Sequence, residues 1–375
     1  MTEPRAVISG IGTSDIGRRL HQDPWLLTAD AALAAIADAG LTVDDIDGVS
    51  TYPGPFGTSP GITGAGAQDV RALLGLRLRW HTGGIEVPGQ LGSIINAVLA
   101  VGSGLAEHVL CFRTVWESSA QDQIGGRSAT LARSLVSEQA QWGKPYGSSY
   151  PTSGALMMQR YLHDSGSTRD QLGQIAVVAR ANAAHNDAAV YREPMSLDDY
   201  LDARVISDPL CLFDCDVPID GSIAVVVSRA DSTAIDQDRA ITIEAVGSAG
   251  NEHSSAEMMW SRTSVQPSDV NVAQLYDGFS ILAVVWMEAL GLCPSGEAGA
   301  FIEGGHRIAR DGELPINTGG GQLSAGRLHG YIGFHEACLQ LRGLGAGRQV
   351  EPRPEVVVVS SGTAYFSSCL LLTRS

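Results

Sequence analysis

Short apolar runs alternate with stretches of helical periodicity along most of the chain. Residues 6–10 form a compact apolar run, and residues 25–39 then place apolar side chains every three or four positions before a glycine. A strand at 48–52 follows, and a helix opened by Pro88 with a strand at 107–112 repeats the unit. Because strands and helices alternate, the pattern predicts an α/β fold whose mixed or parallel sheet is covered on both faces.

The same opening pattern returns in the second part of the chain. The polar stretch 228–239 reads as a linker, and Ile-Thr-Ile-Glu-Ala-Val-Gly after it begins much as Ala-Val-Ile-Ser-Gly-Ile-Gly began the chain. We interpret this as a weak internal repeat with two related halves, 1–235 and 236–375, a size that suits about 100–200 residues per domain. Apolar periodicity fades after Arg113, which predicts an inserted loop region at about 113–200.

The amino-acid composition makes some binding partners and cellular locations unfavourable. The 25 Lys and Arg against 41 Asp and Glu give a net charge of −16, which disfavours binding to nucleic acid or to an anionic membrane. Six scattered cysteines do not form a secreted disulfide scaffold, and the N-terminus lacks a basic leader. No apolar stretch approaches the ~20 residues that a spanning helix needs. We therefore expect a cytoplasmic protein.

Two common motifs are incomplete. Gly10-Ile-Gly12-Thr-Ser-Asp15 has an aspartate where a dinucleotide loop needs its third glycine. Cys211 and Cys215 have no second pair at zinc-ligand spacing, so no metal site is expected.

Four polar segments lie in glycine-rich or apolar surroundings, and a further marked segment is Glu288-Ala-Leu-Gly-Leu-Cys-Pro294. The four are residues 206–221, Leu275-Tyr-Asp-Gly-Phe-Ser280, residues 317–331 and Ser360-Ser-Gly-Thr363. Together and in this order they resemble the thiolase superfamily, specifically its sterol-carrier-protein-x and bacterial lipid-transfer-protein branch. The resemblance implies a thiolase fold, with two similar βαβ-rich halves in five layers (αβαβα), assembled as a homodimer.

The resemblance also shows where the chain departs from a thiolase. The nucleophilic cysteine of that family falls on or beside Val87, and no cysteine occurs before Cys111. Valine has no lone pair with which to attack a thioester, so thiolysis by the usual route is excluded. The family's G-H-P histidine matches Arg327, with His329 two positions on, and its late cysteine matches Ser361 or a neighbour.

Related aldolases in this branch cleave β-hydroxyacyl-CoA thioesters of steroid side chains, and they use tyrosines. Tyr276 matches one of those tyrosines, whereas the second falls on Arg327. The resemblance therefore implies a retro-aldol lyase without a covalent intermediate. Our hypothesis makes Tyr276 the base for the β-hydroxyl, with Arg327 favouring its phenolate and His329 or Tyr331 returning a proton.

The remaining expectations concern the substrate and its binding. Backbone groups of Gly319, Gly320 and Gly321, together with Ser361 and Gly362, are expected to bind the acyl-CoA, which is a substrate and not a bound cofactor. The resemblance also implies a small partner with a zinc ribbon and an OB-fold, forming a heterotetramer.

Two other functions stay open at this point. The chain could be a non-catalytic acyl-CoA-binding subunit or lipid-transfer protein, or an acyltransferase that takes its nucleophile from elsewhere. Tyr, Arg, His and Ser replace the thiolase residues, and these functional side chains favour an enzyme over a decayed site, which would drift towards apolar residues.

Overall fold

The computed structural model describes residues 6–53, 61–84, 90–123, 144–147, 149–363 and 366–374. Within them, nine strands form one mixed sheet in the order β3-β2-β4-β7-β1-β8-β11-β10-β9, and β5 and β6 form a small second sheet. The strands are β1 (Ala6–Thr13), β2 (Gly48–Thr51), β3 (Trp80–Gly83), β4 (His108–Trp116), β5 (Val205–Ser207), β6 (Leu210–Cys211), β7 (Asp220–Arg229), β8 (Ile241–Ser248), β9 (Val272–Gln274), β10 (Val356–Ser361) and β11 (Ser368–Arg374).

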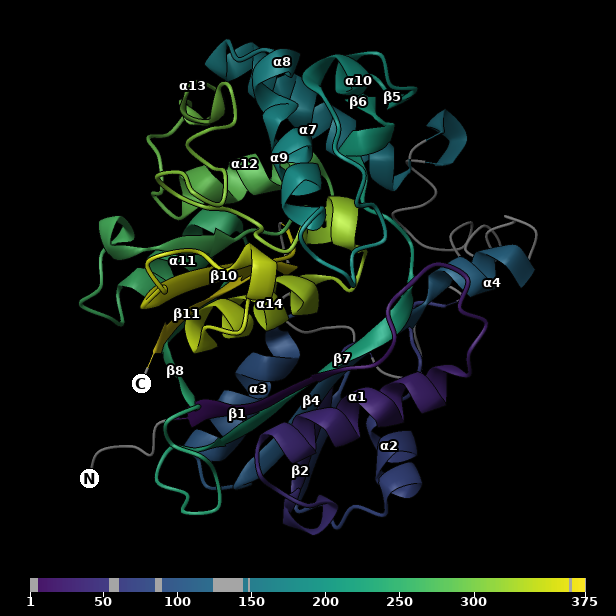
Figure 1. Cartoon of the computed structure of the whole chain (residues 1–375), viewed down its shortest axis with the longest axis vertical. Coiled ribbons are helices and arrows are strands. Elements are labelled where there is room, and N and C mark those ends of the chain that lie inside the picture. Colours follow the sequence, from purple (N-terminus) through teal and green to yellow (C-terminus); the bar gives the residue numbers. More distant parts are fainter. Residues whose placement is uncertain are drawn as a thin grey trace.

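Helices cover both faces of this sheet (Figure 1). They are α1 (Pro24–Asp38), α2 (Ala67–Leu74), α3 (Gly92–Gly102), α4 (Glu117–Gln123), α7 (Tyr150–Ser165), α8 (Arg169–Leu172), α9 (Gln174–Ala183), α10 (Leu197–Leu201), α11 (Glu252–Trp260), α12 (Ser280–Ala289), α13 (Ala298–Ile302) and α14 (Gly330–Arg342). None of the described helices is long and apolar enough to cross a bilayer.

The sheet repeats one strand order on each side of its centre. β2 and β4 are parallel, and β4, β7 and β1 follow with antiparallel pairing. β9 and β10 are likewise parallel, and β10, β11 and β8 follow with antiparallel pairing. The division near residue 235 stays a prediction, and it falls in the segment between β7 and β8.

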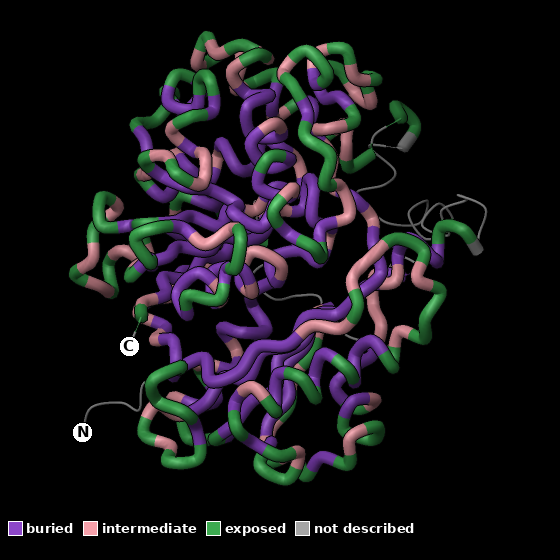
Figure 2. Tube along the Cα trace, in the orientation of Figure 1, coloured by how far each residue is buried: buried purple, intermediate pink, exposed green. Residues whose placement is uncertain are grey.

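Side chains that alternate along the strands divide the molecule into five layers. On β4, Cys111 packs in a central cluster with α3 and α14, whereas Leu110 packs in an outer cluster with α1. On β11, Leu370 joins the central cluster, and Leu371 joins the cluster that contains α12. This arrangement confirms the expected order of helix, sheet, helix, sheet and helix, and Figure 2 shows its buried interior.

Part of the segment after Arg113 is helical in the described residues, and the predicted insertion at about 113–200 stays a prediction. β4 continues to Trp116, and the helices α7, α8, α9 and α10 lie between residues 150 and 201, with an irregular stretch at 184–196. Their apolar residues share a cluster with α12, so this part of the insertion packs on the second half of the chain. The pattern was weak because many of these helical positions are exposed or only partly buried.

The centre of the sheet is held by a buried ion pair as well as by strand pairing. β1 and β8 share only two residue pairs. Beyond them, the carbonyl oxygen of Ser9 accepts a hydrogen bond from Arg342 (2.9 Å), and the backbone N–H of Ile11 donates to Asp38 (2.9 Å). Arg342 also pairs with Asp38 at 2.6 Å. Side chains of α14 and α1 thus bind backbone groups of β1 where β8 no longer pairs.

We expect that Arg342→Met will lower the free energy of unfolding by about 2 kcal/mol, because it leaves the carbonyl oxygens of Ser9 and Arg239 without their donor and removes one of the two arginines that pair with Asp38. Urea denaturation would measure the change. Arg160→Ala is the control, since its exposed pair with Asp164 contributes no more than about 0.5 kcal/mol. Equal effects of the two substitutions would contradict a stabilising role for the Arg342 contacts.

Candidate active site

Tyr276 lies where the end of one strand meets the start of a central helix. It follows β9, and its backbone N–H donates to the hydroxyl of Ser360 at the end of β10 (3.0 Å). Gln90, just before α3, donates from its amide to the phenol oxygen of Tyr276 at 3.3 Å and accepts a hydrogen bond from Ser361. The structure thus brings Tyr276 and Ser361 to one amide, while Val87 lies outside the described residues.

Tyr276 is a neutral phenol at neutral pH. Burial and the nearby Asp216 raise the pKa of Tyr276, and the lowering effects of Arg327 and the Gln90 hydrogen bond do not offset them. Arg327 acts in the predicted direction, because its charge lowers the pKa of Tyr276, but burial and Asp216 outweigh it and the phenol keeps its proton. The sequence showed neither this burial nor the pairing of Arg327 with carboxylates.

Arg327 lies between two carboxylates from distant segments. It contacts Glu117 at the start of α4 and Asp216 before β7, the latter at 3.1 Å. Burial acts to lower the pKa of Arg327, but Asp216 and Glu117 together raise it above its ordinary value. Burial also raises the pKa of Asp216 to about 6 despite the cation beside it. Asp216 therefore loses its proton just below neutral pH.

His329 is held by a second buried arginine, Arg113 of β4. The Nε and Nη2 groups of Arg113 contact His329 Nδ1 at 3.2 and 3.1 Å. Burial, Arg113 and Arg327 lower the pKa of His329 well below its usual value, so the ring is neutral. Because Nδ1 accepts from Arg113, we assign the ring proton to Nε2. His329 can therefore donate a hydrogen bond, but it does not carry an acidic proton at neutral pH.

Arg113 escaped the sequence analysis because it stands in an apolar strand and matches no motif. It is fully buried, and burial lowers its pKa only to about 10, so it stays protonated at neutral pH. Its third nitrogen donates to the backbone carbonyl of Tyr52 at 3.3 Å, and its guanidinium lies 5.6 Å from the centre of the Tyr52 ring. Its position as a lone arginine inside an apolar strand was the one feature of the sequence that could have marked it as a functional candidate.

Tyr331 does not share the role expected for it. Its side chain is fully buried in the central cluster, and its hydroxyl lies 2.6 Å from the hydroxyl of Ser93 on α3. Burial raises the pKa of Tyr331 further. Tyr331 therefore fastens α14 to α3, and we no longer assign it proton transfer.

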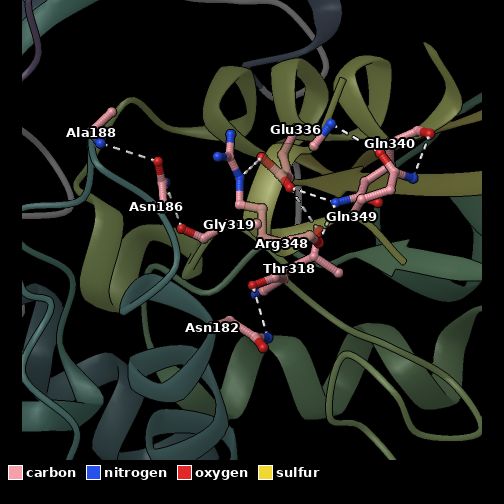
Figure 3. Close-up of polar contacts among 12 residues, drawn as sticks. Asn182, Asn186, Ala188, Thr318, Gly319, Glu336, Gln340, Arg348 and Gln349 are labelled. Carbon is pink, nitrogen blue, oxygen red and sulfur yellow. Dashed lines mark hydrogen bonds and ion pairs between the residues drawn. The ribbon is translucent and has the colours of Figure 1, made fainter. Parts of the chain in front are cut away.

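The glycine turn before α14 is rigidly supported (Figure 3). Asn186 donates to the carbonyl oxygen of Gly319 at 2.8 Å, and Thr318 donates to Glu336 at 2.9 Å. Gly320 has a φ of +102°, and its N–H donates to the carbonyl oxygen of Asn317. That N–H is therefore used within the turn. The sequence analysis had expected it to bind the thioester instead.

The other glycines differ in their surroundings. Gly321 lines a small cavity beside Tyr276, and together with Gly319 it also lines a neighbouring cavity. Gly362 has a φ of +74°, and its carbonyl oxygen accepts from the indole of Trp286 at 2.9 Å. Substrate contacts of Gly319, Gly321, Ser361 and Gly362 stay predictions.

The small cavity beside Tyr276 is where these groups meet. Its lining includes Tyr276, Asp277, Asn317, Gln322, His329 and Ser360. Burial raises the pKa of Asp277 to about 7, and its carboxylate accepts the backbone N–H of Gln322 at 2.8 Å. The cavity therefore offers a neutral phenol, a neutral imidazole and several amides.

No cysteine of the chain is activated as a nucleophile. Five are buried, and burial raises the pKa of each of the six thiols. Cys215 is partly buried and precedes Asp216, yet the pKa of its thiol is raised to about 12. Among the described residues, no group of three metal-ligating side chains occurs. The arrangement suits proton transfer and hydrogen bonding, and not thiolate attack.

Comparison with known proteins agrees with this geometry. Residues 228–374 match the family model "Thiolase C-terminal domain-like". The chain is 32% identical to the 17-hydroxy-3-oxo-4-pregnene-20-carboxyl-CoA lyase of Mycobacterium tuberculosis, over 99% of this chain and all of that protein. The chain belongs to the thiolase superfamily.

The chain is similar to lyases of this superfamily. The steroid side-chain-cleaving aldolase of Thermomonospora curvata is 32% identical over 98% of this chain and 97% of its own. The solved Ltp2-ChsH2(DUF35) aldolase superposes with a TM-score of 0.86 at 30% identity, covering 100% of this chain and 99% of that one. The resemblance inferred from the sequence motifs is therefore confirmed.

Removing Arg327 should destabilise the protein in a pH-dependent way. Arg327→Met takes away a cation that lowers the pKa of Asp216, so this pKa rises further above its unfolded value and stability falls as pH rises from 5 to 8. We expect a loss of about 3 kcal/mol at pH 8 and a smaller loss at pH 5, measured by urea denaturation. Adding Asp216→Asn should recover part of it, whereas a loss independent of pH would refute the proposed charge balance.

Proposed function

We propose that this protein is a carbon–carbon lyase that cleaves a β-hydroxyacyl-CoA thioester, of a steroid or lipid side chain, by a retro-aldol reaction. The observation that carries the proposal is the cavity lined by Tyr276 and His329, which contains proton-transfer groups and no thiolate. Two relatives at 32% identity are a CoA-thioester lyase and a steroid side-chain-cleaving aldolase, which supports the same chemistry.

The protonation states assign each group a step. Asp216 is ionised at neutral pH and accepts the proton of the β-hydroxyl. The bond between the α and β carbons then breaks, which releases a ketone or aldehyde and leaves a thioester enolate. The Nε2–H of His329 donates a hydrogen bond to the enolate oxygen. Tyr276 gives its phenolic proton to the α carbon and regains one from Asp216, so the protons balance.

This scheme changes the role of Tyr276 from the base of our sequence hypothesis to the acid. The change follows from its raised pKa, because a neutral phenol has a proton to give and no charge with which to take one. Arg327 keeps an electrostatic role: its guanidinium lies 3.1 Å from the Asp216 carboxylate and favours the ionised form of that group.

The partners we propose follow the same family. We expect the chain to act as a homodimer with a small zinc-ribbon and OB-fold protein, in a heterotetramer in the cytoplasm. The name of the similar Ltp2-ChsH2(DUF35) aldolase joins two components, which supports a second subunit. In this proposal the CoA thioester is a substrate, and the chain itself binds no cofactor.

Tyr276→Phe should reduce cleavage by at least about 100-fold, because it removes the proton that the enolate carbon receives. Mass spectrometry of the products formed from β-hydroxyacyl-CoA, with and without the partner, measures the effect. Tyr331→Phe is the matched control, since it removes a buried hydroxyl that we place outside the site. Full turnover by Tyr276→Phe would remove Tyr276 from the mechanism.

Treatment with iodoacetamide should leave cleavage unchanged, because the proposed reaction uses no thiolate and burial keeps the six thiols protonated. The rate of ketone release before and after alkylation tests this. If alkylation abolished activity and Cys215→Ser did the same, a covalent acyltransferase route would replace the proposed one.

A further inference from the structure

Gln322 is a buried amide with no hydrogen-bond partner for its side chain. It is 1% exposed, and neither its Oε1 nor its Nε2 atom has a partner among the described residues. Leaving a buried amide unpaired costs about 1–3 kcal/mol. The side chain lines the same cavity as Tyr276 and His329, so its free atoms lie at the proposed reaction site.

The backbone of Gln322 is held firmly on both sides. Its N–H donates to the carboxylate of Asp277 at 2.8 Å, and its carbonyl oxygen accepts from the N–H of Val217 at 3.2 Å. The residue belongs to a π-helical turn, η5 (Gly321–Ala325), a rare structure that often occurs at functional sites. The local structure therefore fixes the position of Gln322 and leaves its carboxamide unbound.

Another buried glutamine of the chain is not left in this state. Gln340 on α14 is also fully buried, but its amide donates to Glu336 at 2.9 Å and its oxygen accepts from the N–H of Val350 at 2.9 Å. The comparison shows that the core of this protein pairs such an amide when the amide is structural.

The unpaired atoms of Gln322 match one kind of substrate group. A carboxamide presents one acceptor and one donor nitrogen, and a hydroxyl group can donate to the first and accept from the second. A thioester or ketone oxygen would satisfy only the nitrogen and leave Oε1 unpaired. The amide nitrogen of Asn317, in the same cavity, also has no described partner, so it supplies a further donor.

We propose that Gln322 binds the β-hydroxyl group of the substrate, and that it thereby selects β-hydroxyacyl thioesters over thioesters that lack this hydroxyl. This inference rests on the proposed function and names the group that the site recognises. For cleavage the hydroxyl turns its proton from Oε1 of Gln322 to the Asp216 carboxylate, and when the carbon–carbon bond breaks the same oxygen becomes a carbonyl that keeps only the bond from Nε2. A bond lost on cleavage weakens the hold on the ketone or aldehyde and favours its release.

Binding of two matched ligands tests the assignment. Calorimetry on the Tyr276→Phe protein, which is expected not to turn over, would compare a β-hydroxyacyl-CoA with the saturated acyl-CoA of the same chain. We expect at least about 10-fold tighter binding of the hydroxylated ligand, because a site built to bind a hydroxyl group rejects the analogue without it. The added substitution Gln322→Met should abolish this preference. A preference that survived Gln322→Met, or no preference at all, would overturn the assignment.

Thermal denaturation separates a binding role from a structural one. Gln322→Met removes two unpaired buried polar atoms, so the melting temperature should stay the same or rise. Gln340→Met, the matched control, should lower it, because it leaves the Val350 N–H and the Arg348 carbonyl without their partner. A fall of similar size in Gln322→Met would show that the residue is structural.

The proposed function and this inference can fail separately. Without cleavage products from the wild-type protein and its partner, the lyase proposal fails, while the binding preference can still be measured. Equal binding of the two ligands with normal cleavage would reject only the role of Gln322.

Discussion

Two guanidinium groups, the fully buried one of Arg113 on β4 and the partly buried one of Arg327 before α14, hold the polar groups of the site in place. Burial and Arg113 keep His329 neutral by lowering its pKa, Arg113 fixes its ring proton, and Arg327 holds the Asp216 and Glu117 carboxylates in place. Because the site is largely screened from solvent, the energy of each charge depends on its partners in the fold. The phenol of Tyr276 stays protonated in these surroundings.

The architecture explains how such distant residues meet. Arg113 lies on β4, Asp216 lies just before β7, and His329 begins α14, so they belong to elements that the five-layer packing brings to the ends of the central helices. The sheet pairs weakly at its middle, between β1 and β8, and the Arg342 contacts with Asp38 and Ser9 close that gap. The site and this closure lie at opposite ends of the same helix, α14.

The sequence could predict the family, the alternation of strands and helices, and the position of Tyr276, because these depend on local periodicity or on short motifs. It could not predict the charge state of Tyr276. The partners of Arg327 stand 111 and 210 residues away, and no local pattern links them to it. Tyr331 looked equivalent to Tyr276 as a tyrosine near the motif, yet its place on the inner face of α14 buries it. The sequence could not predict the role of Gln322 for a related reason. Whether a glutamine side chain lacks hydrogen-bond partners is known only once the surrounding core is known.

The contact between Arg113 and His329 also bears on how this chemistry could have diverged from thiolysis. A thiol becomes reactive when a neighbouring base withdraws its proton. Here the lone pair of His329 at Nδ1 is already committed to a permanent cation, so the imidazole is not free to serve as that base. Restoring a sulfur nucleophile to the site would therefore not by itself recreate an acyltransferase. A return to thiolysis would need at least two changes, a sulfur nucleophile and the loss of the Arg113 contact with His329.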